Sequence, residues 1–130
     1  MSTVLLDSHV LHWWSAEPQR LSRAATDAIT SADELAVASI TWFELAWLAH
    51  RERISLAISV HDWLDGLAAQ VRTIGLTPAV ATTAVSLPTS FPGNPADRII
   101  YATAVDRTWP LVTKDQRLRR YKHPRRVAVW

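Results

Sequence analysis

The chain has 130 residues, of which 48% are hydrophobic, and it contains no cysteine. This composition excludes a disordered chain, disulfide bonds, thiolate metal sites and cysteine nucleophiles, and the length suits one domain spanning residues 1–130. The formal net charge is only +2, but seven of the 14 basic residues lie within residues 114–126. This basic segment indicates an anionic partner, with nucleic acid as the first choice, or otherwise a solvated helix face.

The first predicted element is a strand at residues 4–6, which ends at Asp7. A short, unbroken apolar run bounded by a polar residue is typical of a strand that is covered on both faces, as in a parallel sheet. A carboxylate directly after such a strand lies at the carboxyl edge of the sheet, where open α/β sheets form their binding crevices. Asp7 is therefore the first candidate site residue.

The second candidate, Glu44, lies in a predicted helix over residues 40–51 that is apolar nearly all round. Two short helices, at residues 8–14 and 22–31, and a strand at residues 35–38 are predicted before it. We expect the helix of Glu44 to be largely buried, and a lone carboxylate is costly there unless something compensates its charge. The alternative is a capping box, in which Thr41 and Glu44 satisfy the first backbone amides of the helix.

The third candidate, Asp97, is the third residue of a helix predicted over residues 95–107. Asn94 caps this helix and Pro95 occupies its first position. A carboxylate near a helix N-terminus is favourable by itself, but the apolar residues that continue its side of the helix can also turn Asp97 toward the core. The elements predicted between the second and third candidates are a helix at 59–70, a strand at 71–75, a helix at 78–86 and a loop at 87–95.

The fourth candidate, Asp115, follows a predicted strand at residues 111–113, much as Asp7 follows the first strand. A short basic helix at residues 116–121 and a last strand at 127–129 complete the chain. The alternation of strands and helices predicts an α/β fold, a three-layer α/β/α sandwich around a mostly parallel five-stranded sheet.

The longest stretch without a charged residue, residues 73–96, contains four of the seven prolines and many threonines. This composition is not typical of a membrane-spanning helix. We therefore expect a protein without a membrane partner, located in the cytoplasm.

Four segments resemble motifs of the PIN-domain family, and within it the VapC-type ribonuclease toxins of type II toxin–antitoxin systems. They are residues 5–9 (LLDSH), 39–45 (SITWFEL), 94–100 (NPADRII) and 111–118 (LVTKDQRL). Each motif is short, but the four in this order make a specific resemblance that spans nearly the whole chain. The resemblance implies the strand order 3-2-1-4-5, which places Asp7 beside Asp115.

The resemblance also implies a function: an endoribonuclease that depends on Mg²⁺ or Mn²⁺ and hydrolyses RNA phosphodiester bonds as the toxic component of such a pair. Its implied partners are the RNA substrate, a cognate antitoxin protein and a second copy of the chain in a homodimer. The acidic site residues that it implies are Asp7, Glu44, Asp97 and Asp115, with Thr113 as the hydroxyl beside the last.

This chemistry agrees with the residue types. Carboxylates gathered in one pocket repel one another unless a cation neutralises them, and hard divalent ions prefer oxygen ligands. Such an ion can activate water and stabilise charge on a phosphate. We expect Asp7 and Asp97 to bind the ion most directly, and Glu44 and Asp115 to act through water or at a second ion. Three arginines are candidate RNA contacts: Arg98, Arg117 and Arg119.

Two other functions stay open. The first is a module of the same fold that binds RNA or a protein partner with little or no catalysis. In that case Trp13, Trp14 and Trp47 either pack in the core or face a groove that receives an antitoxin peptide. The second is a small metal-dependent phosphatase, which is disfavoured because it needs another acid two residues after Asp7, where the chain has His9.

Overall fold

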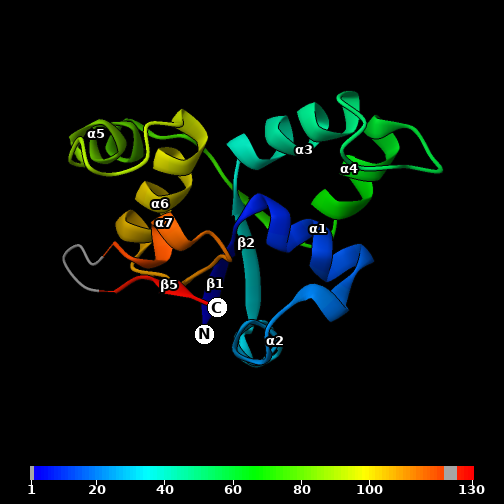
Figure 1. The fold of residues 1–130 in the computed structure, drawn as a ribbon, viewed down its shortest axis with the longest axis horizontal. Helices are drawn as coiled ribbons and strands as arrows, with labels where there is room; N and C mark the ends of the chain where they lie inside the picture. The colour runs from blue at the N-terminus through cyan, green and yellow to red at the C-terminus, as the bar shows by residue number, and fades with distance from the viewer. Residues whose placement is uncertain (1, 122–125) are drawn as a thin grey trace.

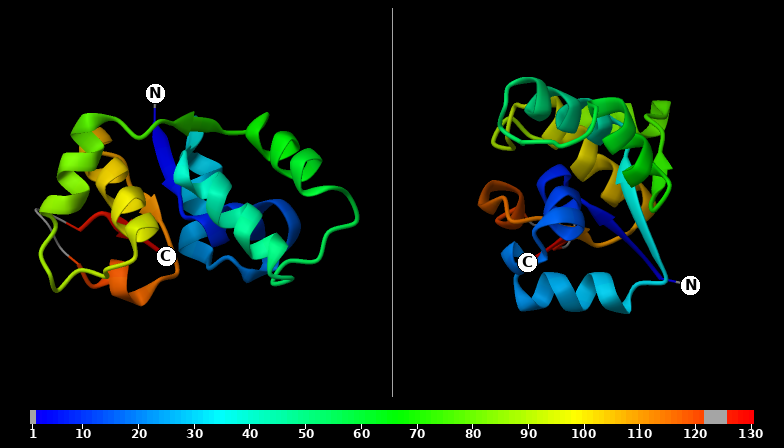
Figure 2. Two further views of the ribbon diagram at one scale, coloured as in Figure 1. Left: turned by 90° about the horizontal axis from the view of Figure 1, so that it is seen from above. Right: turned by 90° about the vertical axis from the view of Figure 1, so that its right-hand side faces the viewer.

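The computed structural model describes residues 2–121 and 126–130, in which one sheet lies between two groups of helices (Figures 1 and 2). The strands are β1 (Thr3–Leu6), β2 (Glu34–Ala38), β3 (Arg72–Ile74), β4 (Leu111–Val112) and β5 (Ala128–Val129). The α-helices are α1 (Ser8–Ala16), α2 (Arg23–Ser31), α3 (Ile40–His50), α4 (Val60–Ala68), α5 (Pro78–Ser86), α6 (Pro95–Arg107) and α7 (Gln116–Arg119), and a 3₁₀ turn, η1, covers Pro18–Arg20.

The five strands are parallel and follow the order β3-β2-β1-β4-β5. This confirms both the predicted sandwich and the strand order that the family resemblance implies. Strand β1 is central, and Leu6 lies opposite Val112 of β4. The two chain segments that follow these residues therefore leave the sheet side by side, although they are far apart in the sequence.

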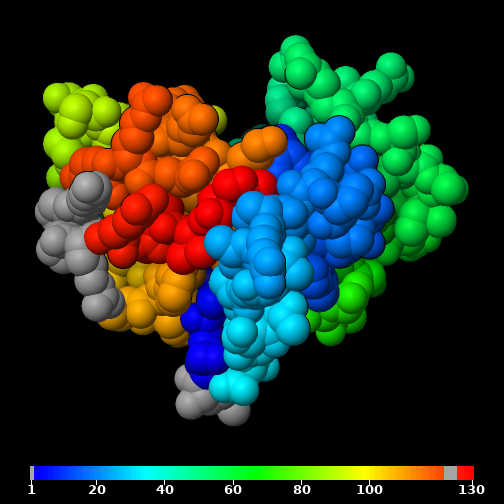
Figure 3. All heavy atoms as spheres, turned by 60° about the horizontal axis from the view of Figure 1, so that its bottom comes forward, coloured from blue at the N-terminus to red at the C-terminus, as the bar shows by residue number. Residues whose placement is uncertain are grey.

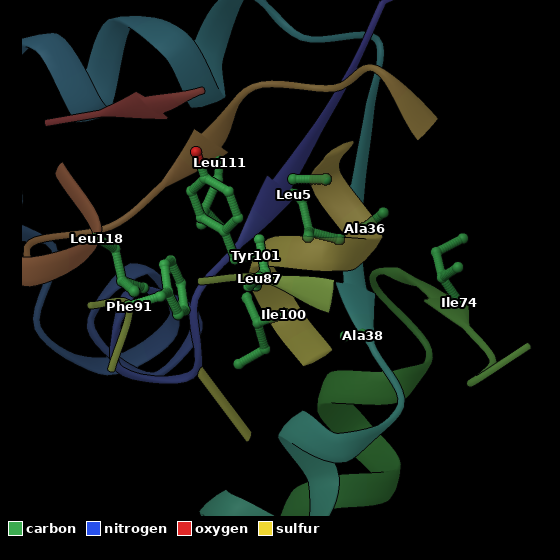
Figure 4. Close-up of a cluster of buried hydrophobic side chains, with 11 residues drawn as sticks. Leu5, Ala36, Ala38, Ile74, Leu87, Phe91, Ile100, Tyr101, Leu111 and Leu118 are labelled. Atoms are coloured by element: carbon green, nitrogen blue, oxygen red, sulfur yellow. The ribbon is translucent and has the colours of Figure 1, made fainter. Parts of the chain in front are cut away.

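Side chains of β1 alternate between two cores, as a strand buried on both faces requires. Leu5 packs with Ile100 and Tyr101 of α6 in the cluster that Figure 4 shows. Val4 and Leu6 enter the opposite cluster, where α1, α2, α3 and α4 contribute apolar residues. The central strand is thus enclosed by helices on both faces, which leaves its carboxyl end as the point where polar groups gather.

Local capping explains where the helices begin. The side chains of Ser22, Ser59, Thr77 and Asn94 each accept a hydrogen bond from a backbone N–H in the first turn of the helix that follows. Helices α5 and α6 begin at prolines, which fit a first helical position. Their bounds equal the predicted ones. The basic helix α7 ends at Arg119, two residues before the predicted end.

One prediction about burial is wrong. Helix α3 is not largely buried: only Thr41 and Leu45 are, while Phe43 is 64% and Trp47 49% exposed. Because the helix is apolar on every side, its sequence has no periodicity that shows which side packs on the sheet. Two basic residues of the predicted anion-binding segment, Lys122 and Arg125, lie outside the described residues. In the part of the chain that the structure describes, no helix is long and apolar enough to cross a bilayer.

Candidate functional site

An open cleft of about 580 Å³ lies at the carboxyl edge of the sheet, and all four predicted acids line it. Its lining consists of Asp7, His9, Trp13, Glu44, Asn94, Asp97, Lys114, Asp115, Gln116 and Arg117. The sheet explains the convergence, because β1 delivers Asp7 and its neighbour β4 delivers Thr113 and Asp115. Helix α3 adds Glu44, and the first turn of α6 adds Asp97.

Asp7 is buried, with 9% of its surface exposed. One carboxylate oxygen caps α1 by accepting a 2.8 Å hydrogen bond from the backbone N–H of Ser8, and the other accepts a 2.7 Å bond from the Thr113 hydroxyl. Burial raises the pKa of Asp7, while these two hydrogen bonds to the charged form lower it. The predicted supporting role of Thr113 thus corresponds to a direct contact with Asp7.

The Glu44 side chain contacts the start of α1 rather than the backbone of its own helix. Its Oε1 accepts a 2.6 Å hydrogen bond from the Ser8 hydroxyl, which lies 3.2 Å from Oγ1 of Thr41. Helix α3 begins after Ser39, with no hydrogen bond from a capping side chain. The capping-box alternative for Thr41 and Glu44 is therefore wrong. Burial raises the pKa of Glu44, and the charge of Asp7 raises it further.

Asp97 shows how strongly the acids interact. It is 8% exposed, and its pKa is raised to about 6, first by burial and then by the charges of Asp7, Asp115 and Glu44. A carboxyl group with this pKa is partly protonated near neutral pH, whereas an ordinary aspartate is not. The cleft therefore holds more negative charge than its own cations neutralise.

Arg117 is the main cation inside the cleft. Its Nη2 lies 2.8 Å from Oδ2 of Asp115 and 3.3 Å from Oδ2 of Asp97, and its Nε donates to Oδ1 of Asp115 over 3.1 Å. These hydrogen bonds lower the pKa of Asp115, in contrast to the other three acids. The sequence placed Arg117 near RNA phosphates, and the structure places its guanidinium between two of the carboxylates.

A divalent ion fits the chemistry of this donor set. The cleft offers carboxylate oxygens in excess of positive charge, which suits a hard cation such as Mg²⁺. Within residues 2–121 and 126–130, however, no group of three or more His, Asp or Glu side chains is close enough to hold a metal ion as it stands. In this structure Arg117 contacts both Asp97 and Asp115, and the hydroxyls of Thr113 and Ser8 engage Asp7 and Glu44.

The other two predicted phosphate contacts lie away from the cleft. Arg98 donates all five of its side-chain N–H groups to backbone carbonyls, so none is left for a phosphate. Its five acceptors are the carbonyls of Ala84, Leu87, Pro88, Phe91 and Pro92. Arg119 lies on α7 in a separate basic depression with Gln116, Arg120 and Arg126.

Sequence reasoning missed several cleft residues: His9, Asn94, Lys114 and Gln116. Each lies within three positions of a predicted acid, so proximity in the sequence was a usable signal. Of the tryptophans considered for a groove, Trp13 lines the cleft, Trp14 of α1 packs against the core, and Trp47 is exposed on α3.

Known proteins resemble this chain over nearly its full length. A sequence model of the PIN domain matches residues 4–124. The curated protein Ribonuclease VapC22 of Mycobacterium tuberculosis is 70% identical over 130 residues, and the match covers 100% of both chains. A toxin–antitoxin complex from Klebsiella pneumoniae has a chain with the same fold, at a TM-score of 0.64, 21% identity and 87% coverage of each chain. VapBC2 from Rickettsia felis, bound to a DNA fragment from its promoter, matches at a TM-score of 0.66 and 16% identity over 91% of this chain and 92% of its own.

Proposed function

The chain belongs to the PIN-domain family, and from this premise we propose that it is a VapC-type ribonuclease, the toxic component of a toxin–antitoxin pair. Support comes from the relative named a ribonuclease, which matches the chain from end to end. The observation that carries the proposal is that carboxylates from four different parts of the chain line one cleft. In this proposal residues 1–130 act as one nuclease domain in the cytoplasm.

The proposed cofactor is Mg²⁺ or Mn²⁺, held by Asp7 and Asp97 directly and by Glu44 and Asp115 through water or at a second ion. When bound, a divalent ion supplies Lewis-acid stabilisation of the phosphate and a water of lowered pKa. Burial and then the neighbouring negative charges raise the pKa of Asp97 to about 6, and this excess of negative charge favours such a cation. A resident divalent ion would relieve the same repulsion and return Asp97 to its charged form.

Residues of the chain itself orient the carboxylates and supply positive charge at the proposed ion site. Thr113 and the Ser8 backbone hold the Asp7 carboxylate in a fixed orientation, and the Ser8 hydroxyl does the same for Glu44. Without a bound ion, Asp97 is partly protonated near neutral pH, because its pKa is about 6. Arg117 is largely exposed and can turn its guanidinium from the carboxylates to a phosphate of the substrate.

Cleavage of RNA tests the proposal. We expect the purified protein to cut RNA in the presence of Mg²⁺ or Mn²⁺, to stop on addition of EDTA, and to lose activity in Asp7→Asn while keeping its fold. The matched control is Asp62→Asn, which removes an exposed carboxylate at the start of α4 and leaves activity unchanged. If Asp7→Asn cuts as fast as the parent, the catalytic site is wrong. If the parent binds RNA without cutting it, a binding module is the better description.

The proposed protein partners are an antitoxin and a second copy of the chain. The Klebsiella and Rickettsia proteins of the same fold were solved as toxin–antitoxin assemblies. On this chain, the exposed rings of Phe43 and Trp47 stack 6.3 Å apart on α3 and form an apolar surface that suits a protein interface. Light scattering of the protein alone and with its antitoxin measures both associations.

A further inference from the structure

Trp13 is the one aromatic side chain of the acidic cleft besides His9, among the residues that the structure describes. It lies on α1, one helical turn after His9, whose ring centroid is 5.7 Å away at an interplanar angle of 46°. Trp130 contacts it at 6.0 Å and 60°. Figure 3 shows the C-terminal segment, in red, lying against the blue N-terminal third of the chain. Neither ring stacks parallel on the Trp13 indole.

The groups over the Trp13 ring are two exposed cations instead of packed core residues. The Lys114 ammonium lies 5.6 Å from the ring centroid and the Arg20 guanidinium carbon lies 5.7 Å from it. Arg20 is also tied to Glu17 by a 3.3 Å ion pair. Within residues 2–121 and 126–130, no carboxylate lies within 4.0 Å of the Lys114 ammonium. The Lys114 ammonium can therefore move away from the Trp13 ring at little cost in free energy.

Lys114 also stands beside the acids. It lies between Thr113, which donates to Asp7, and Asp115, which pairs with Arg117, and it lines the cleft together with Trp13. A phosphate held at the carboxylates would thus have an ammonium group and an indole ring as its neighbours. An ammonium binds phosphate, and an indole face stacks on a nucleobase whatever its sequence.

We propose that Trp13 stacks on a base of single-stranded RNA next to the phosphate at the acidic cleft, and that Lys114 leaves the ring to bind the adjoining phosphate. This assignment rests on the proposed ribonuclease function and names the feature of the substrate that the cleft recognises: an unpaired, unstacked nucleotide. Bases inside a duplex are already stacked on their neighbours, so this platform favours loops and single strands over helical RNA.

Single-abasic oligoribonucleotides test the stacking directly. The probes are short, single-stranded oligoribonucleotides of mixed sequence with a fluorescent label, each with one base removed at a different position. Binding is measured by anisotropy with Mg²⁺ in the Asp7→Asn background, which prevents cutting. We expect one abasic position to weaken binding roughly 5- to 150-fold, the range for loss of one base–aromatic stack.

Variants of Trp13 then identify the ring that the base contacts. Trp13→Leu keeps an apolar side chain against Trp130 but removes the aromatic face. In this variant, removal of the base at the same position should not weaken binding of the probe further. Trp13→Phe should restore most of the affinity and of the abasic effect. The matched control is Trp109→Leu, which removes a half-buried indole that also has two cations over its ring, Arg72 and Arg107, but lies outside the cleft, and it should behave like the parent. Circular dichroism confirms that each variant is folded.

The outcomes separate this inference from the function on which it rests. If the parent cuts RNA but every abasic probe binds the parent and Trp13→Leu with the same loss, the stacking inference is overturned while the ribonuclease stands. If, in addition, an antitoxin peptide binds the parent tightly and Trp13→Leu weakly, the Trp13 ring contacts the protein partner instead of RNA. If the parent cuts no RNA yet the abasic effect depends on Trp13, the stacking inference holds and the ribonuclease fails. If no probe binds, the stacking inference is overturned, and cutting of RNA by the parent still decides the ribonuclease.

Discussion

The Thr113 hydroxyl donates a 2.7 Å hydrogen bond to Oδ2 of Asp7, and 106 positions of the sequence separate the two residues. The bond exists because β1 and β4 are neighbours in the sheet and end at the same level. It is a hydrogen bond to the charged form of a buried carboxyl group, so it opposes the rise in pKa that burial causes.

Thr113→Val removes this donor at nearly constant volume. Without the hydrogen bond, the pKa of Asp7 rises further, so the acidic limb of the pH–rate profile moves to higher pH by roughly one unit, given the usual strength of such a bond. Rates of RNA cleavage between pH 5 and 9 measure the shift. Thr113→Ser, which keeps the hydroxyl, should restore the parent profile.

The control for this variant is Thr103→Val on α6, where a buried threonine hydroxyl donates to the Ile99 carbonyl within the helix. It changes the same atoms far from the acids. A profile for Thr113→Val that coincides with the parent's would show that the bond does not tune Asp7.

Asp97→Asn should stabilise the metal-free protein at high pH. Because the folded-state pKa of Asp97, about 6, lies above its ordinary value, its ionisation favours the unfolded chain, and stability is lost as the pH rises through 6. The asparagine variant lacks this loss. In EDTA we expect it to be more stable than the parent by about 1–2 kcal/mol at pH 8 and nearly equal to it at pH 4.

Thermal unfolding at the two pH values measures this difference, and a gain of 1 kcal/mol corresponds to roughly 3–5 °C. Asp62→Asn, at an exposed position, should give no pH-dependent gain. An equal change at pH 4 and pH 8 in Asp97→Asn would contradict the assignment of the effect to charge.

Arg98→Lys should destabilise the protein although the charge is kept. A lysine ammonium has three donors on a flexible stem and cannot reach the five carbonyls that the guanidinium holds. We expect a loss of about 2–4 kcal/mol in the free energy of unfolding, as for other broken buried networks. Urea denaturation measures it. Arg120→Lys, at an exposed position on the chain, should change the stability by less than about 0.5 kcal/mol.

Magnesium should stabilise the Arg117→Gln variant more than the parent. Mg²⁺ raises the melting temperature because it binds the folded state, and in the parent it competes with a guanidinium that already contacts Asp97 and Asp115. Removing that positive charge increases the affinity for the ion. The measurement is the shift in melting temperature on titration with Mg²⁺.

Arg119→Gln is the matched control for this titration, because it removes an equal charge from the same helix outside the cleft. Its Mg²⁺-dependent shift should equal that of the parent. If Arg117→Gln gives a smaller shift than the parent, the guanidinium helps to build the ion site instead of competing for it.

Local rules predicted much of this fold. Proline at the first helical position predicted where α5 and α6 begin, and Asn94 also predicted the cap of α6. The apolar run of β1, bounded by Asp7, predicted a buried parallel strand. The order of the strands, in contrast, came from the family resemblance, because alternation of strands and helices by itself leaves many orders possible.

Local sequence rules could not predict hydrogen-bond partners that only the tertiary fold brings together. Glu44 fitted a capping box by spacing, but its oxygen accepts from Ser8, 36 positions away. Arg98 was predicted to contact a phosphate, but its guanidinium donates to backbone carbonyls of the loop before α6. The sequence shows that a side chain carries a charge, whereas the fold decides which group meets that charge.

The central position of β1 in the sheet has a consequence for folding during synthesis. A nascent chain on the ribosome already carries Asp7, but the strand that must lie beside it, with Thr113 and Asp115, is made more than a hundred residues later. Until that segment emerges from the exit tunnel, the acids have no shared cleft. A nascent chain that stops before β4 therefore lacks Thr113 and Asp115 and cannot form the acidic cleft.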